Sequence, residues 1–486
     1  MCYKNNKGEN IIFQIKSYRL LLLGSLLGFL VPNLAQASGF ALIENSASGQ
    51  GNAYAGAAAH AVDGSTVWFN PAGMMKLDRD QLVFAGHIVS PNASFTNNGS
   101  SLSPALGPTS GDLTGIDDDG GSLAFVPNFY WVKTINDSTK FGLGMNSPFG
   151  LATEYDKNWV GRYHGVLSDL KTVNINPSLA YRINDRVSIG GGLNLMLGTI
   201  DLTSAIDMGA VCQAGWTQAV DQAFAIAACG GTGASPQALD GFADLTGENL
   251  DNLSTGFNLG ITFEASDQTT IGMSYRSEVE MKVTGDADFT VPTTSSALDL
   301  VIAASVVNGS GLFADTGLRS TVDLPASLSL SGSHQAGEFT WLADVTWTGW
   351  SSFQELRIVY DNPDQPDTVT TEEWVDTYRF SLGLDYQYSD GLILRTGVAF
   401  DETPVPSAER RTVRLPGNDR TWLSFGLTYL INKNMTMDVG YSHLFVDDAP
   451  INNTLETSFA ELNATVTGEY DASVDILSAQ FNWNYN

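Results

Sequence analysis

Apolar and polar residues alternate along much of this chain, most plainly in its last ten residues. From Leu477 to Tyr485 every odd position is apolar and every even position is polar. Side chains alternate across a β-strand, so such a segment has one apolar and one polar face. Segments of this kind recur and predict about fourteen strands: 82–88, 123–132, 141–145, 172–181, 187–197, 257–263, 269–284, 324–332, 341–347, 378–386, 392–400, 423–429, 435–443 and 477–485.

The connections between these segments alternate between short turns and long polar loops. The short turns lie at 135–137, 183–186, 265–268, 389–391 and 431–434. The long loops lie near 97–121, 148–170, 204–255, 286–320, 349–373, 402–419 and 448–470. Outer-membrane barrels of bacteria have an even number of strands, short periplasmic turns and long external loops. The pattern therefore predicts an all-β fold, a transmembrane antiparallel β-barrel over residues 80–486, with both chain ends on the periplasmic side.

The charged residues of segment 269–284 indicate which face meets lipid. Its odd positions are mostly apolar, and its charged residues occupy even positions: Arg276, Glu278, Glu280 and Lys282. Charge is costly against hydrocarbon, so we expect the even positions to face the lumen. By the same rule Arg379 and Arg395 point inward. The residues expected in the interfacial aromatic girdles are Trp341, Trp347, Trp422, Trp483 and Tyr485.

The first residues have the pattern of an export signal. Residues 1–37 combine a basic start, an apolar run and the small-x-small sequence Ala35-Gln36-Ala37, which together are typical of a cleavable signal peptide. A membrane anchor is the alternative, but the apolar run is short and a cleavage site follows it. Residues 38–79 are rich in Gly, Ala and Ser and lack strand alternation, so we expect an N-terminal hatch, or plug, inside the lumen.

Composition narrows the possible functions. The chain carries 24 Lys+Arg against 53 Asp+Glu, a net charge of −29, which argues against nucleic-acid binding. The five His show no metal-ligand spacing, and Gly190-Gly191-Gly192 lies inside an alternating segment rather than before a helix. We therefore expect no metal, no cofactor and no enzymatic activity.

Two cysteines remain after the predicted signal, which contains Cys2, is removed. Cys212 and Cys229 lie 17 positions apart. In an exported chain this pair predicts one disulfide that closes a loop. A metal pair is the alternative, but no His or third Cys lies nearby in the sequence.

Six short motifs, in order along the chain, resemble those of the FadL family of outer-membrane transporters for hydrophobic compounds. They are Ser38-Gly39-Phe40, Asn70-Pro71-Ala72-Gly73, Pro148-Phe149-Gly150-Leu151-Ala152-Thr153-Glu154, Tyr275-Arg276-Ser277-Glu278-Val279, Trp347-Thr348-Gly349-Trp350-Ser351-Ser352-Phe353 and Phe400-Asp401-Glu402-Thr403-Pro404-Val405-Pro406. Each motif is weak alone, but their order on this topology makes the match specific. The resemblance runs from Ser38 to the C-terminus.

Within the hatch, the resemblance implies roles for four residues. Phe40 resembles the aromatic residue that contacts the family's ligand pocket, although it is equally suited to packing the hatch. Asn70, Pro71 and Ala72 match the family's hatch motif, and we expect them to form a rigid corner that keeps the hatch seated. In an arbitrary protein the same residues would simply form a turn.

At the end of the third strand, Pro148, Phe149 and Gly150 mark an expected break. Pro cannot donate to a strand ladder and Gly weakens a strand. In the family this strand kinks inward and opens a side window, through which ligand leaves into the membrane. Gly150 matches the kink region, and Pro148 favours broken pairing. The other interpretation is a plain strand end.

The basic residues that hold a carboxylate in the family's best-known member do not map onto this chain. Where one is expected after Leu197, the sequence reads Gly198-Thr199-Ile200-Asp201. Arg276, Arg379 and Arg395 could replace them as ligand-binding residues. Alternatively these arginines pair with lumen acids, for which the candidates are Glu278, Glu280 and Asp385.

The resemblance implies passive uptake of long-chain fatty acids or similar hydrophobic compounds across a bacterial outer membrane, by binding in the lumen, hatch rearrangement and lateral exit. Two alternatives stay open: import of aromatic or alkane hydrocarbons, and a structural or adhesive porin-like barrel. The expected partners are the ligand, outer-membrane lipid and lipopolysaccharide, with no nucleic acid. We expect a monomer.

Overall fold

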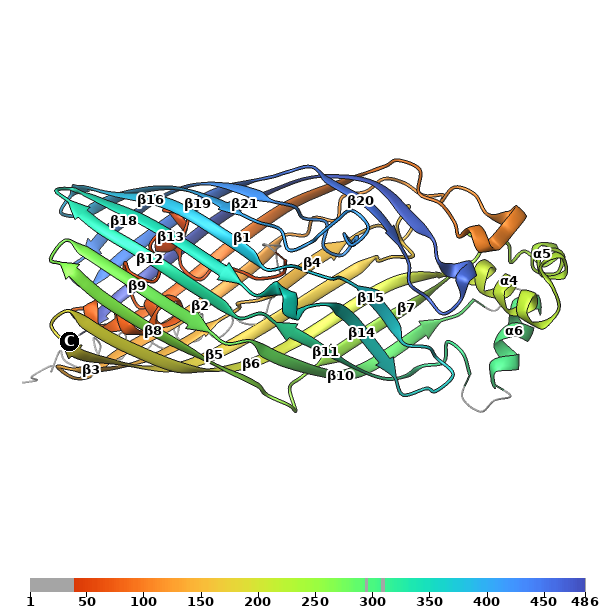
Figure 1. Ribbon diagram of the computed structural model, residues 1–486, viewed down its shortest axis with the longest axis horizontal. Helices are drawn as coiled ribbons and strands as arrows, with labels where there is room; N and C mark the ends of the chain where they lie inside the picture. Colours follow the sequence, from red (N-terminus) through yellow and green to blue (C-terminus); the bar gives the residue numbers. More distant parts are fainter. Residues whose placement is uncertain (1–38, 293–295, 307–310, 486) are drawn as a thin grey trace, which may run out of the picture.

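The computed structural model describes residues 39–292, 296–306 and 311–485, so the predicted signal peptide lies outside the described residues. The chain forms a closed antiparallel β-barrel of fourteen strands (Figure 1). Seven strands are continuous: β1 (Asp80–Asn97), β2 (Ala124–Asn136), β5 (Leu167–Asn184), β6 (Val187–Asp207), β17 (Leu392–Asp401), β18 (Arg420–Asn432) and β21 (Thr465–Tyr485). The predicted all-β barrel is confirmed.

The other seven barrel strands each consist of two segments. These are β3 (Thr139–Asn146) with β4 (Gly150–Glu154), β7 (Asp240–Glu248) with β8 (Ser254–Ser266), β9 (Thr269–Arg276) with β10 (Val279–Thr290), β11 (Thr316–Leu324) with β12 (Ser327–Ala336), β13 (Phe339–Thr348) with β14 (Glu355–Tyr360), β15 (Thr368–Thr371) with β16 (Thr377–Ser389), and β19 (Met435–Val446) with β20 (Ala449–Thr454). The barrel closes where β21 pairs with β1, from Asp80↔Tyr485 to Asn97↔Gly468.

The two ends of the barrel differ (Figure 1). One end carries the short turns, including one between β12 and β13 that the sequence analysis missed because Gly337 is its single strong turn-forming residue. The other end carries the long loops with most of the helical segments. These are η3 (Pro104–Thr109), α4 (Met208–Ala219), α5 (Gln222–Gly231), α6 (Ser296–Val306) and η5 (Ala460–Leu462), whereas η4 (Trp350–Ser352) lies at the break between β13 and β14.

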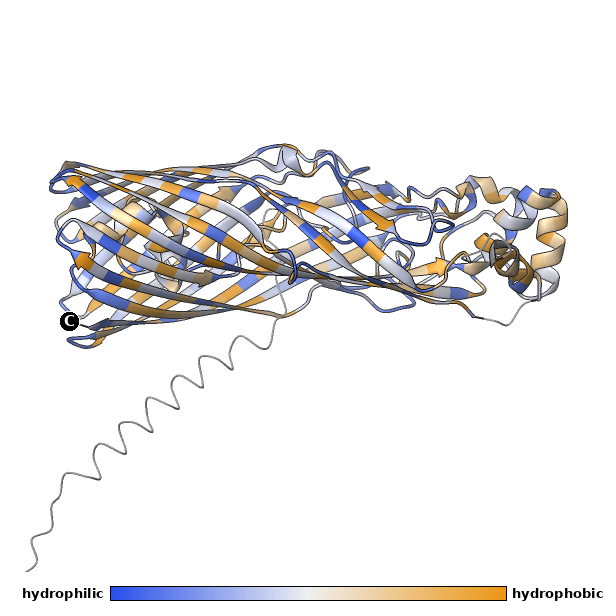
Figure 2. Ribbon diagram, turned by 90° about the horizontal axis from the view of Figure 1, so that it is seen from below, coloured by the Kyte–Doolittle hydropathy of each residue, from blue (hydrophilic) through white to orange (hydrophobic). Residues whose placement is uncertain are grey.

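The outer face of the barrel is apolar near the short turns, as the alternation predicts. Large apolar side chains point outward there and are exposed, among them Leu179, Leu193, Leu382 and Leu477. Figure 2 shows the resulting alternation of apolar and polar residues along the strands. None of the described helices has the length and apolar character needed to cross a membrane.

One predicted face assignment is wrong beyond Arg276. In β9 the even residues face inward, and Arg276 is buried. Ser277 and Glu278 fall between β9 and β10, and the alternation then shifts by one residue, so Val279, Met281 and Val283 point inward. Glu280 and Lys282 form an exposed ion pair with a distance of 2.6 Å. A one-residue slip inverts every side chain of a strand.

One predicted girdle residue is also wrong. Trp422 is fully buried and faces the lumen, where its ring lies 6.5 Å from that of Tyr54. Its neighbours Thr421 and Leu423 point outward. The remaining expected girdle residues are at least partly exposed, with Trp341 the most exposed among them.

Residues 39–79 fold inside the barrel, near the end with the short turns (Figure 1). They contain α2 (Ala47–Gln50), α3 (Thr66–Phe69) and η2 (Pro71–Lys76), and they contact strands on several sides of the lumen. The wall comes close because glycines face them. A Cβ atom on Gly190 would lie 2.5 Å from the backbone nitrogen of Ala72, and one on Gly260 would lie 1.9 Å from Asn70 Oδ1.

Candidate functional site

Phe40 lies at the centre of a cluster of aromatic rings inside the barrel. Its ring centroid is 4.8 Å from that of Trp350, 5.3 Å from Phe353, 5.6 Å from Trp374 and 6.1 Å from Phe149. Edge-to-face contacts at such distances add to the gain from burying the rings. Aliphatic side chains complete the cluster, among them Met196, Val279, Met281, Val283, Val322 and Leu324. Phe40 therefore fills an apolar site built by residues far apart in the sequence.

The backbone beside Phe40 closes a break in the barrel wall. β3 pairs with both β2 and β5, but within the described residues β4 forms a ladder with β5 alone. The amide of Leu42 donates to the carbonyl of Pro148 at 2.8 Å, and the amide of Gly150 donates to the carbonyl of Phe40 at 2.8 Å. Residues 40–42 thus occupy the strand edge at Pro148–Gly150 with which β2 does not pair.

An inner cavity lies beside this break, with Pro148 and Phe149 among its lining residues. Its apolar lining includes Ile43, Trp68, Phe69, Phe149 and Trp350. Four charged residues also line it: Arg276, Asp344, Arg379 and Asp401. This combination suits a molecule that is mostly apolar and has a polar end.

An outer cavity opens among the long loops. Its apolar wall comes from barrel strands beyond the breaks, with Leu202, Ala243, Leu245, Ile358 and Tyr360 among the lining residues. Ile200 and Leu356 pack both against this wall and against the cluster around Phe40. Apolar contact is therefore continuous from the outer cavity to Phe40.

A buried carboxyl group lies next to the aromatic cluster. Trp374 Nε1 donates to Glu372 Oε2 at 2.9 Å. Glu372 is 4% exposed, and this burial raises the pKa of its carboxyl to about 8. The group is therefore mostly protonated at neutral pH.

The three arginines expected in the lumen are there, but they differ in their partners. Arg395 forms ion pairs with Asp385 at 3.3 Å and Asp438 at 3.1 Å, which is the structural alternative considered above. Arg379 Nη2 donates to the carbonyl of Ala53 at 2.9 Å. Glu278 and Glu280 cannot pair with a lumen arginine. Ser277 and Glu278 lie between β9 and β10 and shift the alternation of β10 by one residue, so Glu280 points outward.

Arg276 is held by residues 39–79 rather than by an acid. Its Nη2 donates to the carbonyl of Trp68 at 2.7 Å, and its guanidinium stacks 3.3 Å from the centre of the Trp68 ring. Its Nη1 donates to Asn194 Oδ1. Among the described residues it makes no ion pair.

Asn70 connects the turn at residues 70–73 to the barrel wall. Its Nδ2 donates to the carbonyl of Ala58 at 2.7 Å and to that of Ile261, in β8, at 3.0 Å. Its Oδ1 accepts from the amide of Ala72 at 3.1 Å and caps η2, with Pro71 as the first residue of that helix. Asn70, Pro71 and Ala72 therefore form a turn that is also anchored to the wall.

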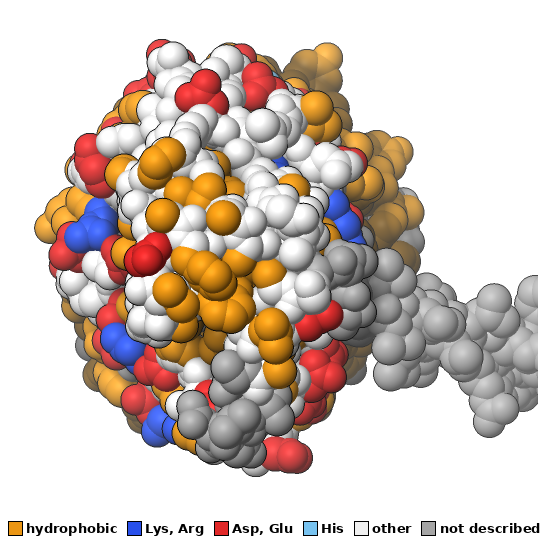
Figure 3. Space-filling model, turned by 90° about the vertical axis from the view of Figure 1, so that its right-hand side faces the viewer, with side chains coloured by type: hydrophobic (Ala, Val, Ile, Leu, Met, Phe, Trp, Pro, Cys, Tyr) orange, Lys and Arg blue, Asp and Glu red, His pale blue; other side chains and the backbone are white. Residues whose placement is uncertain are grey.

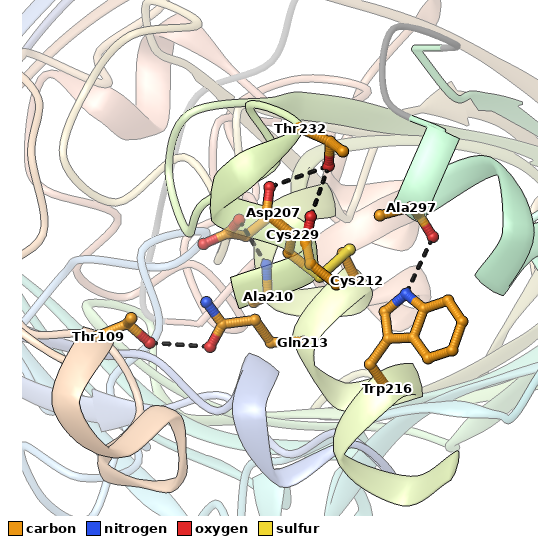
Figure 4. The surroundings of a disulfide bond; sticks show 10 residues. Thr109, Asp207, Ala210, Cys212, Gln213, Trp216, Cys229, Thr232 and Ala297 are labelled. Atoms are coloured by element: carbon orange, nitrogen blue, oxygen red, sulfur yellow. Dashed lines mark hydrogen bonds between the residues drawn. A yellow bond between two sulfur atoms is a disulfide. The ribbon is translucent and has the colours of Figure 1, made fainter. Parts of the chain in front are cut away.

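Cys212 and Cys229 form a disulfide between α4 and α5 (Figure 4). In its surroundings Trp216 Nε1 donates to the carbonyl of Ala297 at 3.2 Å, which ties α4 to α6. Apolar side chains gather in the middle of the end of the molecule that carries the long loops (Figure 3). Exposed apolar residues of these helices and the segment between them are Val220, Phe224 and Leu300.

Sequence reasoning missed several residues of the aromatic cluster. Trp350 and Phe353 lie in a quoted motif, but nothing local in the sequence brings them near Phe40. Trp374 follows a long loop and carried no signal. Val279 and Met281 were assigned to the wrong face. Within the described ranges, no group of His, Cys, Asp and Glu is arranged to hold a metal ion.

Comparison with known proteins shows which family this chain belongs to. Residues 28–485 match the sequence model of the outer membrane protein transport proteins OMPP1, FadL and TodX. The long-chain fatty acid transport protein of Escherichia coli K12 is 32% identical over 434 residues, which cover 87% of this chain and 91% of that protein. Outer membrane protein P1 of Haemophilus influenzae is 30% identical, with 84% and 86% covered.

Solved structures share the fold. A Pseudomonas aeruginosa FadL homologue superposes with a TM-score of 0.78 at 23% identity, covering 92% of this chain and 100% of the other. The Pseudomonas putida toluene transporter TodX gives a TM-score of 0.65 at 16% identity, with 92% and 99% covered.

Proposed function

This chain belongs to the OMPP1/FadL/TodX family of outer membrane transport proteins, and from that membership we propose that it takes up long-chain fatty acids or similar hydrophobic compounds. The ligand binds in the outer cavity, moves into the apolar cluster around Phe40, and leaves sideways through the break between β3 and β4. Residues 39–79 act as the hatch, whose movement opens this path.

The double role of Phe40 is the observation that carries the proposal. Its side chain fills the apolar cluster, while its carbonyl accepts from Gly150 in the wall. A ligand that takes the place of the ring must move the backbone of residue 40. That movement breaks the hydrogen bonds that fill the edge of β4. Ligand binding and opening of the wall are thereby coupled through one residue.

Free energies favour an apolar tail as the main source of affinity. Burial contributes about 0.8 kcal/mol per CH₂ group, whereas one hydrogen bond to a charged group contributes roughly 1.5–3 kcal/mol. Burial of a long acyl chain therefore contributes more to the free energy of binding than the contacts of its head group. So tight a site would release ligand slowly, and a hatch movement that weakens the cluster supplies the release.

A disulfide between residues 40–42 and the broken strand tests this mechanism. Ala41 and Phe149 are opposite each other in an antiparallel bridge, flanked by the two hydrogen bonds described above. Such a non-hydrogen-bonded pair has its Cα atoms about 4.5 Å apart, within the range of a disulfide. The Ala41→Cys/Phe149→Cys double variant, oxidised in the outer membrane, is expected to lose most uptake of a radiolabelled fatty acid and to regain it after reduction.

The single variants Ala41→Cys and Phe149→Cys serve as controls for the loss of the native side chains. Wild-type protein treated with the same reductant controls for reduction of the Cys212–Cys229 bond. If the oxidised double variant takes up ligand as fast as its reduced form, residues 40–42 do not need to leave the wall, and the proposed lateral path is wrong.

A further inference from the structure

Arg414, in the loop between β17 and β18, is an unneutralised cation at the outer cavity. Its Nη1 donates to the carbonyl of Leu167 at 2.6 Å and to Ser168 Oγ at 2.8 Å, and its Nη2 lies 3.4 Å from the carbonyl of Thr203. All three partners are neutral. Among the described residues Arg414 makes no ion pair, although a buried guanidinium is costly without a compensating charge.

Within the described part of the chain, no second positively charged side chain lines this cavity. Among its described lining residues Arg414 is the single Arg or Lys. His164 also lines it, but Nδ1 contacts Asn453 Oδ1 at 3.2 Å and Nε2 contacts the carbonyl of Ala464 at 3.1 Å. Burial lowers the pKa of His164 to about 4, so its ring is neutral at neutral pH.

Three of the four acids that line the cavity are engaged elsewhere. Glu456 pairs with Arg410 and Asp367 pairs with Arg357. Asp207 accepts from backbone amides at the start of α4, and Glu461 also lines the cavity. The titratable groups that act on Arg414 itself are Tyr155, Tyr360 and Glu372, which are neutral or mostly protonated at neutral pH.

An apolar wall faces this cation across the same cavity. Leu202, Ala243, Leu245 and Ile358 supply it, and Leu356 continues it toward the aromatic cluster. A cavity with one unpaired guanidinium and an extended apolar wall matches an amphiphile with an anionic head group.

We propose that Arg414 binds the anionic head group of the ligand in the outer cavity, so that the protein selects long-chain carboxylates over uncharged hydrocarbons. This inference rests on the proposed uptake of hydrophobic compounds. The apolar tail lies along the wall and leads toward Phe40.

A dye in the outer cavity can report binding there directly. Ser204 lines this cavity, and the two cysteines of the exported chain are joined to each other, so Ser204→Cys gives one labelling site for an environment-sensitive fluorophore. The labelled full chain, in lipid nanodiscs, is titrated with palmitate and with hexadecanol, which has the same chain length and no charge.

In Arg414→Met we expect the half-saturating palmitate concentration to rise roughly ten- to a hundredfold, while that of hexadecanol is unchanged. Arg414→Lys keeps the charge and is expected to fall between Met and wild type. Arg411→Met is the matched control. Arg411 is a buried arginine of the same loop that donates to the carbonyls of Gly417 and Pro450 and does not line the cavity. It should leave both curves in place.

Equal weakening of palmitate and hexadecanol in Arg414→Met, or no weakening of either, overturns the inference and leaves uptake of hydrophobic compounds standing. If neither compound changes the dye signal of the parent protein, capture in the outer cavity is wrong, and the proposed function fails together with the inference. Retained hexadecanol binding also shows that an Arg414 variant is folded.

Discussion

At the scale of single residues, the proposed path through the barrel passes side chains whose charge is set by burial. Glu372 shows this most clearly. Its carboxyl accepts from the indole of Trp374, one of the rings around Phe40. Burial holds the proton on the carboxyl up to a pH of about 8, so an acid is placed beside an apolar cluster without a charge at neutral pH.

This proton makes stability depend on pH. The pKa of Glu372 is about 8 in the folded protein and near 4.5 ordinarily, so between these values the folded state binds one more proton than the unfolded state. The contribution of protonated Glu372 to the free energy of unfolding is fully present below about pH 4.5 and is lost as the pH rises through 8. Its upper limit is about 1.4 kcal/mol for each unit of pKa shift.

Glu372→Gln keeps a neutral acceptor for Trp374 and removes the titration. Its apparent melting temperature in detergent, followed by tryptophan fluorescence, should therefore fall less than that of wild type between pH 5 and pH 8. Parallel curves for the two proteins would show that Glu372 is ionised in the fold at neutral pH.

At the scale of elements, residues 39–79 pack against parts of the barrel wall where the strands have glycine. Gly190 in β6 and Gly260 in β8 face the turn at residues 70–73. Because a Cβ atom at Gly260 would overlap Asn70 Oδ1, the contact of Asn70 with the carbonyl of Ile261 depends on glycine at that position. The same requirement holds for Gly190, whereas Cβ atoms on Gly191 and Gly192 would meet the strand residues Leu259 and Ser178 instead of the turn.

Gly260→Val is expected to unseat residues 39–79 while the barrel still forms. Overpacking of this kind typically costs about 1–3 kcal/mol. Faster proteolysis within residues 39–79 should accompany unchanged mobility of the folded barrel on a gel. Gly332→Ala in β12 is the control, because a Cβ atom there meets nothing within 4 Å. Equal proteolysis of both variants would contradict the conclusion that residues 39–79 require glycine at position 260 of the wall.

At the scale of the whole molecule, the barrel exists only when its first and last strands meet. β21 pairs with β1 along its length, and the final residues face the start of the barrel at Asp80↔Tyr485. A closed barrel leaves no unpaired strand edge in lipid, where each unsatisfied backbone group is costly. The C-terminal strand is therefore required for the transmembrane structure as a whole.

Deletion of residues 477–486 should abolish the folded, heat-modifiable form on unheated gels, since β1 and β19 would face lipid with free edges. Deletion of α5, residues 222–231, removes the same length from an external loop, and combined with Cys212→Ser it should leave that form intact. A folded barrel lacking residues 477–486 would show that closure does not need this part of β21.

The sequence alone determined the strand number and the two kinds of connection, because both follow from local alternation and turn-forming residues. At Pro148–Gly150 the residues favoured a break but left a plain strand end as the alternative. The tertiary structure decided which face each segment presents beyond its break. Val279 and Met281 continue the apolar pattern of β9, yet they line the lumen because two residues between the strands shift the alternation.

The tertiary structure also decided which distant residues meet. Phe40, Phe149, Trp350 and Trp374 come together only because the barrel closes around residues 39–79. Arg414 looks like any loop cation in the sequence, and its lack of an acidic partner is a property of the folded neighbourhood. Periodicity carries information between adjacent residues, whereas these contacts depend on strand register and closure summed around the whole barrel.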